Sequence, residues 1–144
     1  MPGPFAVDAS VFLNAFNPRE SGSEVSKEVL ARLQSQAVPL ISPTLVLPET
    51  AAAISRGQNQ PELARQFALA LQRLPHLILV PLDPILAQQA VEMAARARLR
   101  GSDAVYAAVA QRFACPLLTL DREQHERLAE VLSTRYPAEV LPSL

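Results

Sequence analysis

The sequence predicts an α/β fold of three layers, in which helices flank a central parallel sheet of about five strands. Short apolar runs bounded by proline or polar residues are typical of buried strands, and amphipathic segments with helical periodicity lie between them. Strands that alternate with helices form a parallel sheet covered on both faces. The expected strands are Phe5–Asp8, Val38–Ser42, Leu77–Leu82, Pro116–Leu120 and Ala138–Leu141.

Four segments between these runs carry apolar residues at the spacing of amphipathic helices. Asp83 and Pro84 are favoured at the N-cap and at the first position of one of them. Asp121 and Gln124 form the pattern of a capping box at the start of another. The expected helices are Ser23–Gln36, Pro61–Leu74, Pro84–Leu99 and Arg122–Leu132.

Two positions are expected to interrupt helices. Gly101 should end the helix that begins at Pro84, and Ser102 should cap the next helix, which carries Asp103. Pro48 lies beside Glu49, and proline lacks the N–H that a helix interior needs. The sequence therefore predicts a kink or a broken helix start at Glu49.

Length and composition limit the class of protein. The chain has 144 residues, of which 49% are hydrophobic and 19% charged, so we expect a single domain over residues 1–144. Its longest apolar runs are far shorter than the ~20 residues of a membrane span. The N-terminus lacks the basic region of a secretion signal. We therefore expect a cytoplasmic protein with no membrane association.

Charge, glycine and cysteine usage exclude several functions. A net charge of −1 does not fit a general nucleic-acid coat. The four glycines, at positions 3, 22, 57 and 101, cannot form a GxxxxGK or GxGxxG phosphate-binding loop. Cys115 is the only cysteine, so neither an internal disulfide nor a cysteine-based zinc site is possible. We expect its thiol to be buried and inert.

Two aspartates end predicted strands. Asp8 follows the run FAV, and Asp121 follows the run CPLLTL. Because ligands of parallel sheets bind outside the carboxyl ends of the strands, both side chains should lie at one edge of the sheet. Carboxylates gathered there repel one another unless a cation joins them, and Mg²⁺ or Mn²⁺ is the natural hard counter-ion. The pattern predicts a metal-dependent hydrolase of phosphate esters.

Two more acids complete the candidate cluster, Glu49 in SPTLVLPETAAAI and Asp103 in GSDAVYAAVA. Each of the four also has a purely structural interpretation. Asp8 and Asp121 can cap the helices that follow them, Asp103 can complement a helix dipole, and Glu49 can face solvent. Residue type and position alone leave both interpretations open.

Hydroxyl groups near two of the aspartates favour the cluster. Ser10 stands two residues after Asp8, and Thr119 two residues before Asp121. Metal-binding carboxylates are oriented by such hydrogen-bonding neighbours. Asp83 also follows an apolar strand but has no hydroxyl two residues before it, and we assign it to helix capping alone.

Four motifs of the chain, taken in order, resemble those of the PIN-domain ribonucleases and, among them, the VapC-type toxins of bacterial toxin–antitoxin pairs. The motifs are VDAS, PET, RGSDAVYAAVA and LLTLDREQ, and the resemblance covers nearly the whole length. It implies four acids that bind one or two Mg²⁺ ions, with Mn²⁺ as a substitute, and two hydroxyl groups that assist them. By this resemblance the acids are Asp8, Glu49, Asp103 and Asp121, and the hydroxyl groups belong to Ser10 and Thr119.

The activity that the resemblance implies is metal-dependent endoribonuclease cleavage. Metal-activated water would hydrolyse the RNA phosphodiester bond and leave a 3′-hydroxyl and a 5′-phosphate. The resemblance also implies a homodimer and a small antitoxin protein that covers the site. A housekeeping RNA-processing nuclease and a non-catalytic RNA- or protein-binding module on the same fold are the alternatives.

The planar guanidinium of arginine suits phosphate, so arginines are the candidate substrate contacts. Those near the acids in sequence are candidates for gripping RNA, although each can equally be a solvated surface side chain. His125, one helical turn beyond Asp121, is a further candidate. The arginines are Arg56, Arg96, Arg98 and Arg100.

Overall fold

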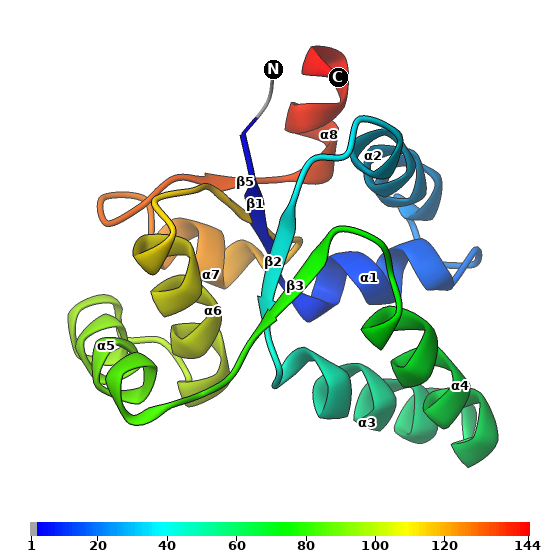
Figure 1. Ribbon diagram of the computed structural model, residues 1–144, viewed down its shortest axis with the longest axis horizontal. Helices are drawn as coiled ribbons and strands as arrows, with labels where there is room; N and C mark the ends of the chain where they lie inside the picture. The colour runs from blue at the N-terminus through cyan, green and yellow to red at the C-terminus, as the bar shows by residue number, and fades with distance from the viewer. Residues whose placement is uncertain (1–2) are drawn as a thin grey trace.

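The computed structural model describes residues 3–144 and contains a five-stranded parallel sheet with helices on both sides (Figure 1). The strand order is β3-β2-β1-β4-β5, and every neighbouring pair is parallel. The predicted α/β class and parallel sheet are confirmed. The strands are β1 (Phe5–Val7), β2 (Leu40–Pro43), β3 (Leu77–Val80), β4 (Leu117–Leu118) and β5 (Thr134–Arg135).

Helices connect the strands and form the two outer layers. In Figure 1, α5 and α6 lie to one side of the sheet, and α1, α2, α3 and α4 lie to the other. No helix among residues 3–144 is long and apolar enough to cross a membrane. The helices are α1 (Ala9–Phe16), α2 (Ser23–Ser35), α3 (Val46–Gln58), α4 (Pro61–Gln72), α5 (Pro84–Ala97), α6 (Gly101–Arg112), α7 (Arg122–Arg127) and α8 (Pro137–Val140), followed by a 3₁₀ helix at Leu141–Ser143.

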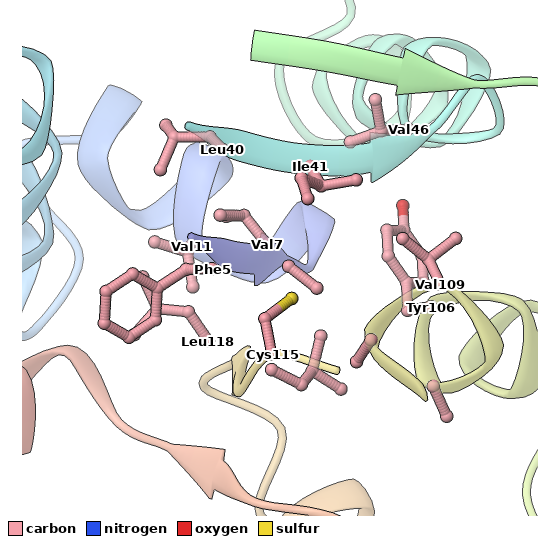
Figure 2. Close-up of a cluster of buried hydrophobic side chains, with 14 of the residues drawn as sticks. Phe5, Val7, Val11, Leu40, Ile41, Val46, Tyr106, Val109, Cys115 and Leu118 are labelled. Carbon is pink, nitrogen blue, oxygen red and sulfur yellow. The ribbon is translucent and has the colours of Figure 1, made fainter. Parts of the chain in front are cut away.

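The core lies around the central strand β1 and the helix α6. Every residue of β1 is buried, as is each residue of α6 from Ala104 to Ala110. A helix that is apolar on all sides must be enclosed by other elements, and α6 packs against β1, β2, β4 and α5. Figure 2 shows Tyr106 and Val109 of α6 facing the strands. Asp103, in the first turn of α6, is therefore carried by a rigid element.

The strand order reverses beside β1. The chain proceeds from β1 to β2 and β3 on one side, whereas β4 and β5 add to the other side. In open α/β sheets, the gap between two such strands at their carboxyl ends is where ligands bind. Asp8 directly follows β1, and Thr119 directly follows β4. The fold therefore brings these two residues to the edges of that gap.

The predicted strand Ala138–Leu141 is wrong. The fifth strand is Thr134–Arg135, and Pro137–Val140 forms α8. Pro137 takes the first helical position, where its missing N–H costs nothing. The carboxylate of Glu139 accepts a hydrogen bond from the backbone N–H of Tyr136 at 2.9 Å and closes the first turn. These local bonds favour a helix over the apolar pattern of a strand.

Two helix boundaries also differ from prediction. Gly101 does not end α5: Arg98 is the C-cap in the left-handed conformation (φ 55°), and Gly101 begins α6 after the N-cap Arg100. Pro48 does not break α3, because it lies in the first turn, where backbone N–H groups have no partner within the helix. Glu49 therefore stands on an intact helix.

Candidate functional site

The four predicted acids come from four separate elements at the carboxyl edge of the sheet. Asp8 is the N-cap of α1 after β1, and Asp121 is the N-cap of α7 after β4. Glu49 lies in the first turn of α3, the helix that follows β2, and Asp103 in the first turn of α6. We call the four side chains the acid cluster.

Asp8 is the most buried member, with 6% of its surface exposed. Its Oδ2 accepts hydrogen bonds from the hydroxyl groups of Ser10 at 3.0 Å and Thr119 at 2.7 Å. Burial raises the pKa of Asp8 to about 6, the two hydroxyl groups oppose that rise, and the charges of Asp103 and Glu49 add to it. The predicted hydroxyl partners are thus in contact with a carboxylate, and both hold Asp8.

Glu49 has a partner that the sequence analysis missed. The phenol of Tyr106, whose residue is 1% exposed, donates a hydrogen bond to Glu49 Oε1 at 2.6 Å. In Figure 2 the hydroxyl of Tyr106 points toward the side on which Val46 begins α3. Burial and the Glu49 carboxylate both raise the pKa of Tyr106, so its proton stays on the phenol. A lone polar ring in the apolar run AVYAAVA was the only signal in the sequence.

Arg100 joins the other two acids. Its guanidinium lies 3.2 Å from Asp103 Oδ2 and 3.5 Å from Asp121 Oδ2, while 74% of the arginine side chain remains exposed. Burial raises the pKa of Asp103, Arg100 opposes this, and the charges of Asp121 and Glu49 add to the rise. An exposed ion pair of this kind is weak. Arg100 is therefore a loosely held counter-charge between two carboxylates.

Gln124 is the second residue that the sequence analysis undervalued. Its backbone N–H donates to Asp121 Oδ1 at 3.1 Å, which confirms the predicted cap. The side chain does not complete a capping box. Its Nε2 donates to the carbonyl of Asp103 at 3.2 Å, and its Oε1 lies 3.1 Å from the Thr119 hydroxyl. The side chain is buried among the acid-bearing segments.

The side chains of the remaining candidates make no hydrogen bond or ion pair with the acid cluster within residues 3–144. Arg56 and Arg96 are exposed, and residues 3–144 offer them no ion pair. The carbonyl of Arg98 accepts a hydrogen bond from Arg127. The His125 ring stacks on Tyr136 with ring centres 4.4 Å apart.

Asp83 and Cys115, for which the sequence analysis predicted no role in the site, behave as expected. Asp83 Oδ1 accepts from the backbone N–H of Leu86 at 2.7 Å and caps α5. It also lies 3.5 Å from Arg112. Cys115 is buried, and burial raises the pKa of its thiol, which keeps it protonated and unreactive.

The acid cluster fits a hard divalent cation by its chemistry. All four members offer carboxylate oxygen, the donor that Mg²⁺ and Mn²⁺ prefer. Burial raises the pKa of Asp8 and Asp103, and the charges of other members of the acid cluster add to the rise. Within residues 3–144, no three acidic, histidine or cysteine side chains already converge as a metal-binding group. Each carboxylate instead contacts a protein partner. Metal binding would therefore require these side chains to turn toward one another.

A parallel sheet with acids at its reversal point defines a class of α/β proteins whose site lies at the carboxyl edge. The chain belongs to the PIN-domain family, which matches residues 5–131. The sequence resemblance to that family is thus confirmed. Comparison with curated proteins gives no match.

Solved structures of similar fold include toxins and toxin–antitoxin complexes. VapC20 of Mycobacterium tuberculosis, described as a sarcin–ricin loop cleaving toxin, is 20% identical with a TM-score of 0.69, covering 85% of this chain and 93% of its own. FitAcB of Neisseria gonorrhoeae is 16% identical, with a TM-score of 0.70 and coverage of 93% and 98%. PAE2754 of Pyrobaculum aerophilum is 21% identical, with a TM-score of 0.68 and coverage of 99% and 97%. At these identities the likeness is one of fold.

Proposed function

We propose that this protein is a metal-dependent endoribonuclease, the toxin of a toxin–antitoxin pair, with its active site at the acid cluster. The observation that carries the proposal is the placement of four carboxylates from four elements around the reversal point of the sheet, with Asp8 buried among them. A buried, uncompensated carboxylate is costly. A bound cation would remove that cost.

Asp8, Glu49, Asp103 and Asp121 would hold Mg²⁺, or Mn²⁺ in its place. When bound, the metal would lower the pKa of a water molecule and stabilise negative charge on the phosphate. The protein would orient its ligands: Ser10 and Thr119 fix one oxygen of Asp8, which leaves Oδ1 free of both hydroxyl groups.

Arg100 supplies a cation that can move. It is paired with Asp103 and Asp121 in this structure, yet most of its side chain faces solvent. Once a metal neutralises the two aspartates, the guanidinium would be free to contact the RNA phosphate. Arg56, Arg96 and Arg98 stay predictions as further phosphate contacts.

The proposed partners follow from the relatives. The Rickettsia felis VapBC2 complex and the FitAB complex were solved with DNA fragments, and a Klebsiella pneumoniae relative is a toxin–antitoxin complex. We infer a small antitoxin protein that covers the acid cluster of this chain, and a homodimeric toxin. The low net charge fits weak RNA binding outside the site.

Inducible expression in bacteria tests the activity. The wild type should arrest growth and create discrete new RNA 5′ ends, whereas Asp103→Asn should do neither, because it loses a metal-binding charge within a side chain of nearly the same shape. Asp83→Asn is the matched control: it makes the same change at an acid outside the cluster, and asparagine still caps a helix. It should behave as the wild type.

The same comparison separates the alternatives. Cleavage by the purified wild type without growth arrest would identify an RNA-processing nuclease. Metal binding without cleavage of any RNA would identify a non-catalytic module. Equal cleavage by wild type and Asp103→Asn, each abolished by EDTA, would place the reaction outside the acid cluster and overturn the proposed site.

A further inference from the structure

Gln124 is a buried polar side chain at the centre of the carboxyl edge. The residue is 1% exposed, although it stands on the short helix α7. A buried amide is costly unless its donor and acceptor are satisfied. Helix packing alone would be served by an apolar residue, as it is one turn later at the fully buried Leu128. The amide group at this position therefore calls for an explanation other than packing.

The contacts of Gln124 reach the segments of three acids. The side-chain Nε2 donates to the carbonyl of Asp103 at 3.2 Å, and the backbone N–H donates to Asp121 Oδ1 at 3.1 Å. The side-chain Oε1 lies 3.1 Å from Thr119 Oγ1, whose hydroxyl is 2.7 Å from Asp8 Oδ2. Gln124 thus links the ends of β1 and β4 to the start of α6.

The link between α6 and β4 matters most for Asp103. Besides the amide of Gln124, the polar side-chain contact that joins Asp103 to the β4 side within residues 3–144 is made through Arg100, which is largely exposed. Exposed ion pairs are screened and easily broken. The amide of Gln124 is buried and makes no contact with Arg100, so its hydrogen bond to the Asp103 carbonyl does not depend on that ion pair. It can therefore fix the spacing between Asp103 and the Asp8–Asp121 pair during metal binding.

We propose that Gln124 is the positioning residue of the acid cluster: its amide fixes the first turn of α6 against the end of β4, so that the carboxylates on the two elements can share one cation. The inference rests on the proposed function and adds a residue that acts through others. Gln124 does not itself bind the metal or RNA.

Metal affinity tests the role directly. Gln124→Met keeps the length and the unbranched shape of the side chain but removes both amide contacts. Titration calorimetry of the purified full chain with MnCl₂ should show a dissociation constant about tenfold or more above that of the wild type, the effect expected when a partner of a metal ligand is lost. Affinity within twofold of the wild type would overturn the inference.

Ser26→Ala is the stability control. It removes a buried hydrogen bond, 2.6 Å from Ser26 Oγ to Asn14 Oδ1, that contacts none of the acids. Its Mn²⁺ affinity should match the wild type even where its melting temperature falls as far as that of Gln124→Met. Equal weakening of Mn²⁺ binding in both variants would show a general effect of instability and overturn the positioning role.

A second variant at the same position tests the inference if Gln124→Met does not fold. Gln124→Asn keeps the amide but is one methylene too short to span the Asp103 carbonyl and the Thr119 hydroxyl together, so it should also bind Mn²⁺ more weakly. Wild-type affinity in this variant would count against the inference. A wild type that binds no Mn²⁺ would overturn the proposed metal site itself, which distinguishes that failure from the failure of Gln124 alone.

Discussion

At the scale of single residues, the acid cluster is defined by the partner of each carboxylate. Asp8 is held by two hydroxyl groups, Glu49 by a phenol, and Asp103 and Asp121 by a guanidinium. The neutral partners can remain when a cation arrives, since they donate to the carboxylate and carry no charge. Arg100 is a cation that competes for the same oxygens. The residues around the acids therefore divide into permanent supports and one exchangeable counter-charge.

Tyr106→Phe tests whether the hydrogen bond from Tyr106 to Glu49 contributes to metal binding, because it leaves the charge of Glu49 in place. The change removes one hydroxyl and leaves the ring that packs in the core, so the melting temperature should change little. Mn²⁺ affinity should fall about tenfold or more, because Glu49 loses the hydrogen bond that orients it. Calorimetric titration measures the affinity and thermal melting the stability.

The control for that change is Tyr136→Phe, at the other of the two tyrosines. Tyr136 stacks on His125 and, within residues 3–144, makes no hydrogen bond with the acid cluster. Its variant should bind Mn²⁺ as the wild type does. A Tyr106→Phe protein with unchanged affinity would mean that the contact with Glu49 serves packing alone.

At the scale of elements, the site depends on helices that begin at the carboxyl edge. The first turn of α3 carries Glu49 and that of α6 carries Asp103, and the Asp121 side chain caps α7. Asp8 stands at the N-cap position of α1, but its side chain makes no capping hydrogen bond. A helix N-terminus favours negative charge. Glu49, Asp103 and Asp121 therefore gain local stabilisation that is independent of a metal, so their structural and functional interpretations are compatible. The Asp8 side chain does not form the cap that its structural interpretation required.

Asp83→Ala tests the structural role of an acid outside the cluster. It removes the side chain that caps α5, which should lower the free energy of unfolding. Helix α5 packs against α6, but the contacts that Asp83 makes within residues 3–144 are with Leu86 and Arg112 and not with the acid cluster, so Mn²⁺ affinity should be unchanged. Urea denaturation gives the free energy. A loss of metal affinity here would show that the site depends on α5 as well.

At the scale of the whole molecule, the charge distribution bears on the proposed binding of RNA. The net charge is −1, and four carboxylates occupy the candidate site. Of the four predicted arginines, Arg100 alone is brought to the acids among the described residues. The phosphates of a bound RNA would therefore contact few cationic side chains at the candidate site.

The salt dependence of RNA binding measures how many cations contact phosphate. Single-stranded nucleic acid loses affinity with a log–log slope of about −0.7 per phosphate contact, so four arginines would give about −3 and Arg100 alone would give about −0.7. We expect the smaller slope. Fluorescence anisotropy with a labelled, non-hydrolysable RNA analogue at a fixed MgCl₂ concentration, over a series of KCl concentrations, measures it. A slope near −3 would restore Arg56, Arg96 and Arg98 as contacts.

The sequence by itself determined the alternation of strands and helices, because burial dictates apolar runs and helical spacing. It also predicted the four candidate acids from their positions near strand ends and helix starts. It did not predict β5, a two-residue strand too short to show a pattern, or the intact start of α3 at Pro48. Only the tertiary structure showed that Tyr106 contacts Glu49, 57 positions away, and that Gln124 reaches Asp103. Such contacts depend on how separate elements pack, and no local spacing in a single chain encodes that.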